Sequence, residues 1–190
     1  MTSNIKKLYE TKNKFKGFLV AGDPSMEKTA EYVEAIVAGG ASLVEIGVPF
    51  SDPIAEGEII FAANVRALAQ EGGCTTDMVF DMIESVKDKV NVPFVLRIYM
   101  NQVFKYGYDK FFAKCNELGI KGLVIPDLPA VEMDEITEYM EKYDVDVITV
   151  VTTEEEEYKR DMMLETIRDH ADTACERLRK YVKSMVVAHA

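Results

Sequence analysis

The chain has 190 residues, of which 48% are hydrophobic and 29% are charged, as in an ordinary globular protein rather than a disordered one. Its formal net charge of −11 disfavours binding to the phosphate backbone of nucleic acids. No apolar run reaches the roughly 18 residues of a membrane span, and the first residues lack the pattern of a signal peptide. We therefore expect a domain-sized soluble protein with a sizeable core.

Cysteines and histidines are few and widely spaced. Cys74, Cys115 and Cys175 show no CxxC spacing, which predicts free thiols in a reducing cytoplasm. His170 and His189 both lie near the C-terminus, so a histidine-based zinc site is not expected.

Apolar runs alternate with amphipathic stretches along the first 150 or so residues. In chain order, the predicted elements are strand 14–21, helix 27–39, strand 41–50, helices 58–70 and 76–89, strand 92–100, helix 107–118, strand 121–126, helix 131–143 and strand 146–151. This alternation predicts βαβ units and a parallel sheet. Strands of such a sheet are buried on both faces, which explains their continuous apolar character.

The pattern changes after Thr153. Residues 154–188 contain neither glycine nor proline, and their apolar residues recur at steps of three and four. This spacing predicts one long amphipathic helix, or two with a small break near Asp169. We therefore divide the chain into an α/β part, 1–153, and a helical segment, 154–190, packed on the same domain or on a partner.

Glu45 is the most informative charged residue, because it interrupts an otherwise apolar strand. A carboxylate in such a strand is expected to be either functional or satisfied by a neighbour. In parallel α/β folds functional groups gather at the carboxyl ends of the strands, where Glu45 is expected to lie. Burial would raise its pKa and suit it to general acid–base work.

Other candidates follow the predicted strands. Glu56, on the loop after the second strand, is a loop charge unless it acts together with Glu45. Asp52 stands before a proline and is typical of a turn, and Asp127 stands near one in the same way. Tyr99, at the end of the third strand, is as a residue type more often packed in a core than functional.

Four stretches together resemble one known family, the tryptophan synthase alpha subunits, which are TIM-barrel lyases. These stretches are FLVAGDP at 18–24, VEIGVPFSDP at 44–53, YMN at 99–101 followed by Tyr106-Gly107, and GLVIPDLP at 122–129. The second stretch is long and specific. The resemblance runs from about Ile5 to Thr153 and implies a partial TIM (β/α) barrel of about five parallel strands.

The resemblance implies a retro-aldol cleavage of indole-3-glycerol phosphate to indole and glyceraldehyde 3-phosphate, without metal or organic cofactor, in tryptophan biosynthesis. Glu45 matches the glutamate that moves the proton between the indole ring and the glycerol hydroxyl. Glu56 falls where the family usually has the aspartate that holds the indole N–H. Phe18, Ile60 and Tyr99 match residues that line the substrate pocket.

The family partner is the beta subunit, a pyridoxal-phosphate enzyme. The residues matching the surface that faces this partner are Pro49, Ser51, Asp52, Pro53, Asn101, Asp127 and Pro129.

Arg97 departs from the family pattern, because it occupies a position on the third strand that is usually apolar and faces the site. It stands two residues before Tyr99, so both side chains are expected on one face. Arg97 is expected either to pair with Glu45, lowering its pKa and weakening it as an acid, or to bind a phosphate or carboxylate group.

The end of the chain departs further. A complete TIM barrel takes about 250 residues, and its phosphate site uses glycine-rich loops near the last strands. No glycine follows Gly122, and residues 179–185 resemble the last helix of the family, which suggests a deletion that removes strands six to eight.

Two functions stay open: an active lyase, or a partial barrel that assembles or binds a partner without turnover. Because a five-stranded part of a barrel leaves two open edges, we also expect self-association.

Overall fold

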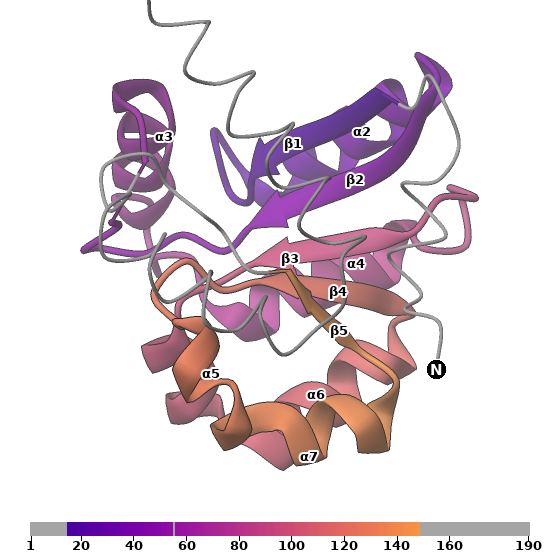
Figure 1. Cartoon of the computed structure of the whole chain (residues 1–190). Helices are drawn as coiled ribbons and strands as arrows, with labels where there is room; N and C mark the ends of the chain where they lie inside the picture. Colours follow the sequence, from indigo (N-terminus) through magenta and orange to yellow (C-terminus); the bar gives the residue numbers. More distant parts are fainter. Residues whose placement is uncertain (1–14, 55, 149–190) are drawn as a thin grey trace, which may run out of the picture. The chain divides into compact units, whose positions relative to one another are not determined.

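The computed structural model describes residues 15–54 and 56–148, which form a parallel five-stranded sheet covered by helices (Figure 1). The strands are β1 (Phe15–Val20), β2 (Ala41–Gly47), β3 (Phe94–Arg97), β4 (Ile120–Val124) and β5 (Asp146–Ile148). They lie side by side in chain order, and each neighbouring pair is parallel. The predicted α/β class with five parallel strands is confirmed.

Helices connect the strands. They are α2 (Met26–Ala38), α3 (Glu58–Leu68), α4 (Thr76–Val86), α5 (Met100–Tyr106), α6 (Tyr108–Glu117) and α7 (Asp134–Tyr143), with a short 3₁₀ turn at Ala130–Glu132. The Ser25 and Thr75 hydroxyls accept hydrogen bonds from backbone N–H groups in the first turns of α2 and α4. Each satisfies an N–H that has no partner within its helix.

The third strand was predicted too long, and α5 was not predicted. Strand β3 ends at Arg97, and α5 begins three residues later at Met100. The Asp127 carboxylate accepts a hydrogen bond from the Met100 N–H at 2.9 Å, and the Gln102 side chain accepts one from the Tyr99 N–H at 3.2 Å. These acceptors satisfy the start of α5, so the chain turns into a helix where its apolar character alone favoured a longer strand.

The two faces of the sheet differ. On the outer face Val44, Ile46 and Val48 join the main hydrophobic core, to which α2, α4 and α6 also contribute buried side chains. Residues of opposite parity point to the other face. There Leu43, Val95 and Val124 form a second, small cluster with Ile148. We call this second side the inner face.

Several predictions concern residues beyond this description. The helical segment 154–190, the expected loss of strands six to eight and Cys175 all lie outside the described residues. Within the described part, β1 and β5 are the edge strands of the sheet. The expected self-association through these edges stays a prediction. Cys74 and Cys115 are free thiols, and no helix of the described residues is both long and apolar enough to cross a membrane.

Candidate active site

Glu45 lies on the inner face of β2 and is 1% exposed. Its neighbours in the sheet register are Phe18 on β1 and Val95 on β3. Both oxygens of its carboxylate are bound by cations: Oε1 accepts from Arg97 Nε at 2.8 Å and Oε2 accepts from Lys16 Nζ at 2.7 Å. A buried carboxylate needs such partners to offset the loss of water. Glu45 is therefore satisfied, and by two neighbours rather than one.

Lys16 was missed from the sequence. It stands two residues before Phe18 on β1, so its side chain shares the inner face with Phe18. In the register Lys16 lies level with Leu43, two residues before Glu45 on β2, and its long side chain reaches the buried carboxylate. A lysine that shares a strand face with a predicted pocket residue is the signal that could have identified it.

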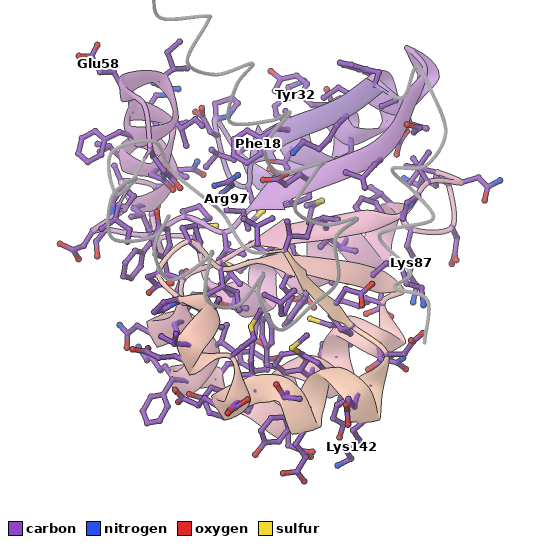
Figure 2. The ribbon with its side chains drawn as sticks, viewed as in Figure 1. Phe18, Tyr32, Glu58, Lys87, Arg97 and Lys142 are labelled. Carbon is purple, nitrogen blue, oxygen red and sulfur yellow. The ribbon has the colours of Figure 1, made fainter. Side chains whose placement is uncertain are left out.

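Arg97 forms the ion pair with Glu45 that the sequence left as one of two alternatives. It is the last residue of β3 and lies level with Gly47 on β2. Its guanidinium also lies over the Phe18 ring, 5.7 Å from the ring centre, and both side chains are labelled near the carboxyl end of β2 in Figure 2. Cations are attracted to the electron-rich faces of aromatic rings, so Phe18 helps to orient the guanidinium.

Gly47 provides the room for this arrangement. A Cβ atom at Gly47 would stand 3.1 Å from Cζ of Phe18, closer than ordinary van der Waals contact. The Phe18 ring therefore packs against the bare backbone of β2. A side chain at this position would push the ring away from Arg97.

Glu56 is held by neutral donors. Its Oε2 accepts from Asn64 Nδ2 at 2.9 Å, and its Oε1 lies 3.1 Å from the Tyr99 hydroxyl. That hydroxyl also accepts from Ile54 N–H at 3.0 Å and lies 2.9 Å from the Ile54 carbonyl, so its single proton serves two acceptors. Burial, and secondly the Glu56 carboxylate, raises the pKa of Tyr99 well above its ordinary value, which keeps the phenol neutral.

Asn64 was not identified from the sequence. It is buried on α3, where it donates to Glu56 and to the Ile60 carbonyl and accepts from the Phe50 N–H at 3.2 Å. These bonds join the loop after β2 to the helix that follows it. An asparagine on the apolar face shared by Ala63 and Ala67 is the pattern that marks such a residue.

The structure brings most predicted site residues to one end of the sheet but does not join the two carboxylates directly. Arg97 contacts Glu45, Tyr99 contacts Glu56, and among the described residues no hydrogen bond links Glu45 to Glu56. The Tyr99 ring stacks on Phe50 at 4.6 Å between ring centres. Ile60 packs at the start of α3 against a small cluster that includes Val20 and Phe18.

The residues predicted to face a partner have mixed exposure. Ser51, Asp52, Asn101 and Pro129 are exposed, while Pro53 and Asp127 are partly covered. Pro49 is buried, and its carbonyl accepts a hydrogen bond from Gln102. The Asp127 carboxylate accepts the hydrogen bond from the Met100 N–H at the start of α5.

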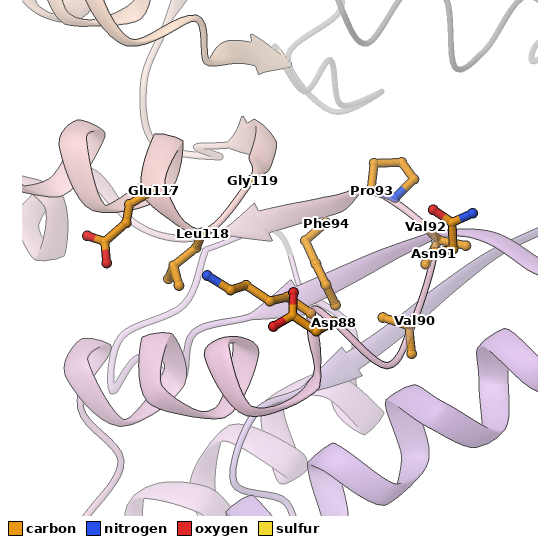
Figure 3. Close-up of a pocket in the computed structure, with 10 residues that line it drawn as sticks. Asp88, Val90, Asn91, Val92, Pro93, Phe94, Glu117, Leu118 and Gly119 are labelled. Carbon is orange, nitrogen blue, oxygen red and sulfur yellow. The ribbon is translucent and has the colours of Figure 1, made fainter.

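A pocket of about 450 Å³ lies at the opposite end of the sheet (Figure 3). It is lined by residues of the segment that leads into β3, including Lys87, Asp88 and Asn91, and by Glu117 to Gly119 before β4. None of the candidate residues lines it, so this pocket is separate from the carboxylate site.

Comparison with known proteins identifies the family. The family model described as "Tryptophan synthase alpha chain" matches residues 5–173. The chain belongs to the tryptophan synthase alpha chain family. It is similar to the tryptophan synthase alpha chain of Lacticaseibacillus casei, with 44% identity over 152 residues that cover 80% of this chain and 56% of that protein.

Solved tryptophan synthase structures share the fold. The alpha subunit from Legionella pneumophila str. Paris is 34% identical, with a TM-score of 0.69 over 75% of this chain and 55% of that chain. A chain from a structure of the tryptophan synthase α2β2 complex of Pyrococcus furiosus is 27% identical, with a TM-score of 0.66 over 73% of this chain and 54% of that chain. The described sheet is thus part of a TIM barrel, and the chain spans about half the length of the curated relatives it matches.

Proposed function

We propose that this protein is an indole-3-glycerol-phosphate lyase of tryptophan biosynthesis, in which Glu45 transfers the proton. The observation that carries the proposal is a carboxylate, 1% exposed, on the inner face of β2 in a chain of the tryptophan synthase alpha family. A glutamate buried there is costly for folding, and catalysis gives a reason to keep it.

The reaction requires two proton movements. The bond between the indole ring carbon and the glycerol carbon breaks, and its electron pair stays with the ring carbon, which takes up a proton. The glycerol hydroxyl on the other carbon loses its proton and becomes the aldehyde oxygen. A single carboxylate that reaches both positions can act first as acid and then as base. Glu45 matches the family residue with this role.

Glu56 is the proposed acceptor for the indole N–H. Tyr99 and Asn64 hold its two oxygens, which fixes the carboxylate without neutralising its charge. A fixed negative charge next to the indole nitrogen stabilises the positive charge that develops on the ring when its carbon is protonated. The extra methylene relative to the usual aspartate is accommodated by Asn64, which binds Glu56 from the next helix.

Phe18, Ile60 and Tyr99 are the proposed walls of the indole pocket. Phe18 and Ile60 belong to one small apolar cluster, and the Tyr99 ring is buried. Flat apolar and aromatic walls suit a flat aromatic substrate.

The two ion pairs of Glu45 set a condition on this mechanism. Proton transfer needs at least one carboxylate oxygen free to face the substrate. The Lys16 side chain is 44% exposed, so it is the partner that can move away more easily. Arg97, which also contacts Phe18, is the partner that stays and orients the carboxylate.

A tryptophan synthase beta subunit is the proposed partner, as in the α2β2 complex of the Pyrococcus furiosus enzyme. Two exposed apolar side chains support this proposal: Phe104 on α5 and Val131 after β4, close in sequence to Asn101 and Pro129. Exposed apolar residues of this size are typical of protein interfaces. We also place the protein in the cytoplasm, where the free thiols Cys74 and Cys115 stay reduced.

The test is the release of indole from indole-3-glycerol phosphate by the full chain, with and without the beta subunit. Glu45→Gln is expected to lower the rate by about 10²- to 10⁴-fold, because the amide cannot exchange a proton. Glu34→Gln is the matched control, since Glu34 pairs with Lys89 at an exposed surface site and should leave the rate unchanged. Absence of indole release in every condition would overturn the lyase proposal, and an unchanged rate in Glu45→Gln would remove Glu45 from the mechanism.

A further inference from the structure

The cluster of Lys16, Glu45 and Arg97 carries one more positive than negative charge. Lys16 and Arg97 both bind Glu45, so two cations share a single carboxylate. The other nearby carboxylate, Glu56, is bound by the neutral side chains of Tyr99 and Asn64, and among the described residues it forms no ion pair. Within this cluster of three described residues, Glu45 therefore neutralises only one of the two cations that bind it.

The described residues engage only one of the donors of the Arg97 guanidinium. A guanidinium carries five N–H groups, and in the described residues only the Nε–H of Arg97 makes a hydrogen bond, to Glu45. No buried side-chain nitrogen or oxygen of the described residues lacks a partner. The terminal nitrogens of Arg97 make no hydrogen bond to another described residue, and the side chain as a whole is 23% exposed.

The position of these donors suits a ligand. Arg97 ends β3, and ligands of parallel α/β proteins bind beyond the carboxyl ends of the strands. The Phe18 ring, whose centre lies 5.7 Å from the guanidinium carbon, and the Nε bond to Glu45 both restrict the orientation of the guanidinium. A fixed guanidinium fork binds two oxygens of one carboxylate or phosphate side by side.

We propose that Arg97, supported by Lys16, forms a binding site for a small oxyanion beside Glu45. The ligand is a carboxylate or phosphate group, either free or carried by a substrate of the proposed lyase. Arg97 binds it through the terminal amino groups, and Lys16 contributes charge from the side of β1. The inference deepens the proposed function, since it assigns an anionic group to the same site, but the binding step needs no turnover.

The competing explanation is that both cations serve only to neutralise Glu45. The two explanations differ in what they predict for the wild type. If the cations only neutralise Glu45, the wild type binds no anion saturably. If they also bind a ligand, the wild type does, and removing the competing charge of Glu45 strengthens that binding. The overall charge of −11 makes non-specific uptake of anions unfavourable, so binding at this site should depend on Arg97.

The test is a titration of the full chain with inorganic phosphate and, separately, with acetate, followed by heteronuclear NMR. The reporter is the backbone amide of Gly47, which lies level with Arg97 in the sheet. We expect saturable shifts with at least one of the two anions. Saturation by phosphate alone assigns the site to a phosphate group, and saturation by acetate alone assigns it to a carboxylate.

Four variants make the test specific. Arg97→Leu should weaken binding by about 10- to 100-fold, and Arg97→Lys by less, because the charge stays while the fork is lost. Glu45→Gln should strengthen binding at least about threefold. Arg66→Leu is the matched control, since Arg66 also binds a carboxylate, that of Asp23, but on an exposed helix face.

The oxyanion site is overturned if neither anion binds saturably. It is also overturned if wild type, Arg97→Lys and Arg97→Leu all bind the anion with the same affinity. If Arg97→Leu fails to fold, the comparison of wild type with Arg97→Lys still decides, because a purely neutralising role predicts no saturable anion binding by the wild type and therefore none for Arg97→Lys to weaken. Indole release is measured independently, so a failure of anion binding leaves the lyase proposal standing, and the reverse also holds.

Discussion

The two faces of β2 carry opposite chemistry within seven residues. The outward side chains Val44 and Ile46 belong to one large apolar core with the helices. The positions that face inward are Leu43, Glu45 and Gly47. There a buried carboxylate is held by two cations, and a glycine without a side chain makes room for an aromatic ring. The outer face is built for stability, whereas the inner face holds charged groups that cost stability unless they are paired.

The largest expected effect on stability is at the outer face. Ile46 is completely buried, so Ile46→Ala should lower the free energy of unfolding by about 2–5 kcal/mol through lost burial and a residual cavity. Urea unfolding measures this change. Ile59→Ala is the control, because Ile59 on α3 is 85% exposed and its truncation should cost less than about 0.5 kcal/mol. Equal effects of the two changes would contradict the description of the core.

The next effect concerns the link between α3 and the loop after β2. Asn64→Ala removes the donor to Glu56 and the acceptor for the Phe50 N–H, which should cost about 1–3 kcal/mol of unfolding free energy. Because Glu56 loses its support, KM for indole-3-glycerol phosphate should rise as well. A stability loss without any kinetic change would mean that Asn64 serves the fold alone.

A smaller effect is expected at Tyr99. Tyr99→Phe removes a hydroxyl that binds Glu56 and the backbone of Ile54, at a cost of about 0.5–1.5 kcal/mol near neutral pH.

The pKa of Tyr99 in the folded protein is raised, while an unfolded tyrosine titrates near 10. Its contribution to stability is therefore complete below pH 10 and is lost as the pH rises toward the folded pKa. Urea unfolding at pH 8 and pH 11 should show a steeper loss in the wild type than in Tyr99→Phe. Identical pH slopes would contradict the burial of this phenol.

The smallest effect on stability is expected for the exposed ion pair between Arg66 and Asp23. Arg66 binds Asp23 through two nitrogens, at 2.8 and 2.7 Å, but its side chain is 57% exposed. Surface ion pairs are screened by water and salt, so Arg66→Leu should change stability by no more than about 1 kcal/mol. Thermal unfolding at low and high salt measures it, and a salt-independent loss above that size would show that the pair is effectively buried.

The sequence predicted the sheet well because burial on both faces gives each parallel strand a continuous apolar run. It failed at Met100, where the acceptor for the backbone N–H is the Asp127 carboxylate, which lies 27 residues further along the chain and which the local pattern does not connect to α5. Glu45 was found because a charge in an apolar run is conspicuous. Lys16 and Asn64 were missed because their roles depend on which residues the fold places beside them, and a lysine or an asparagine is ordinary until that neighbour is known.

One paired measurement tests most directly whether the inner face serves chemistry rather than stability. For Glu45→Gln and Ile46→Ala, adjacent residues on opposite faces of β2, both indole release and urea unfolding are measured on the full chain. The account predicts that Glu45→Gln loses at least about 100-fold in kcat/KM while keeping a folded sheet, and that Ile46→Ala loses more stability but keeps its kcat when folded. Rates that follow stability alone in both variants would contradict it.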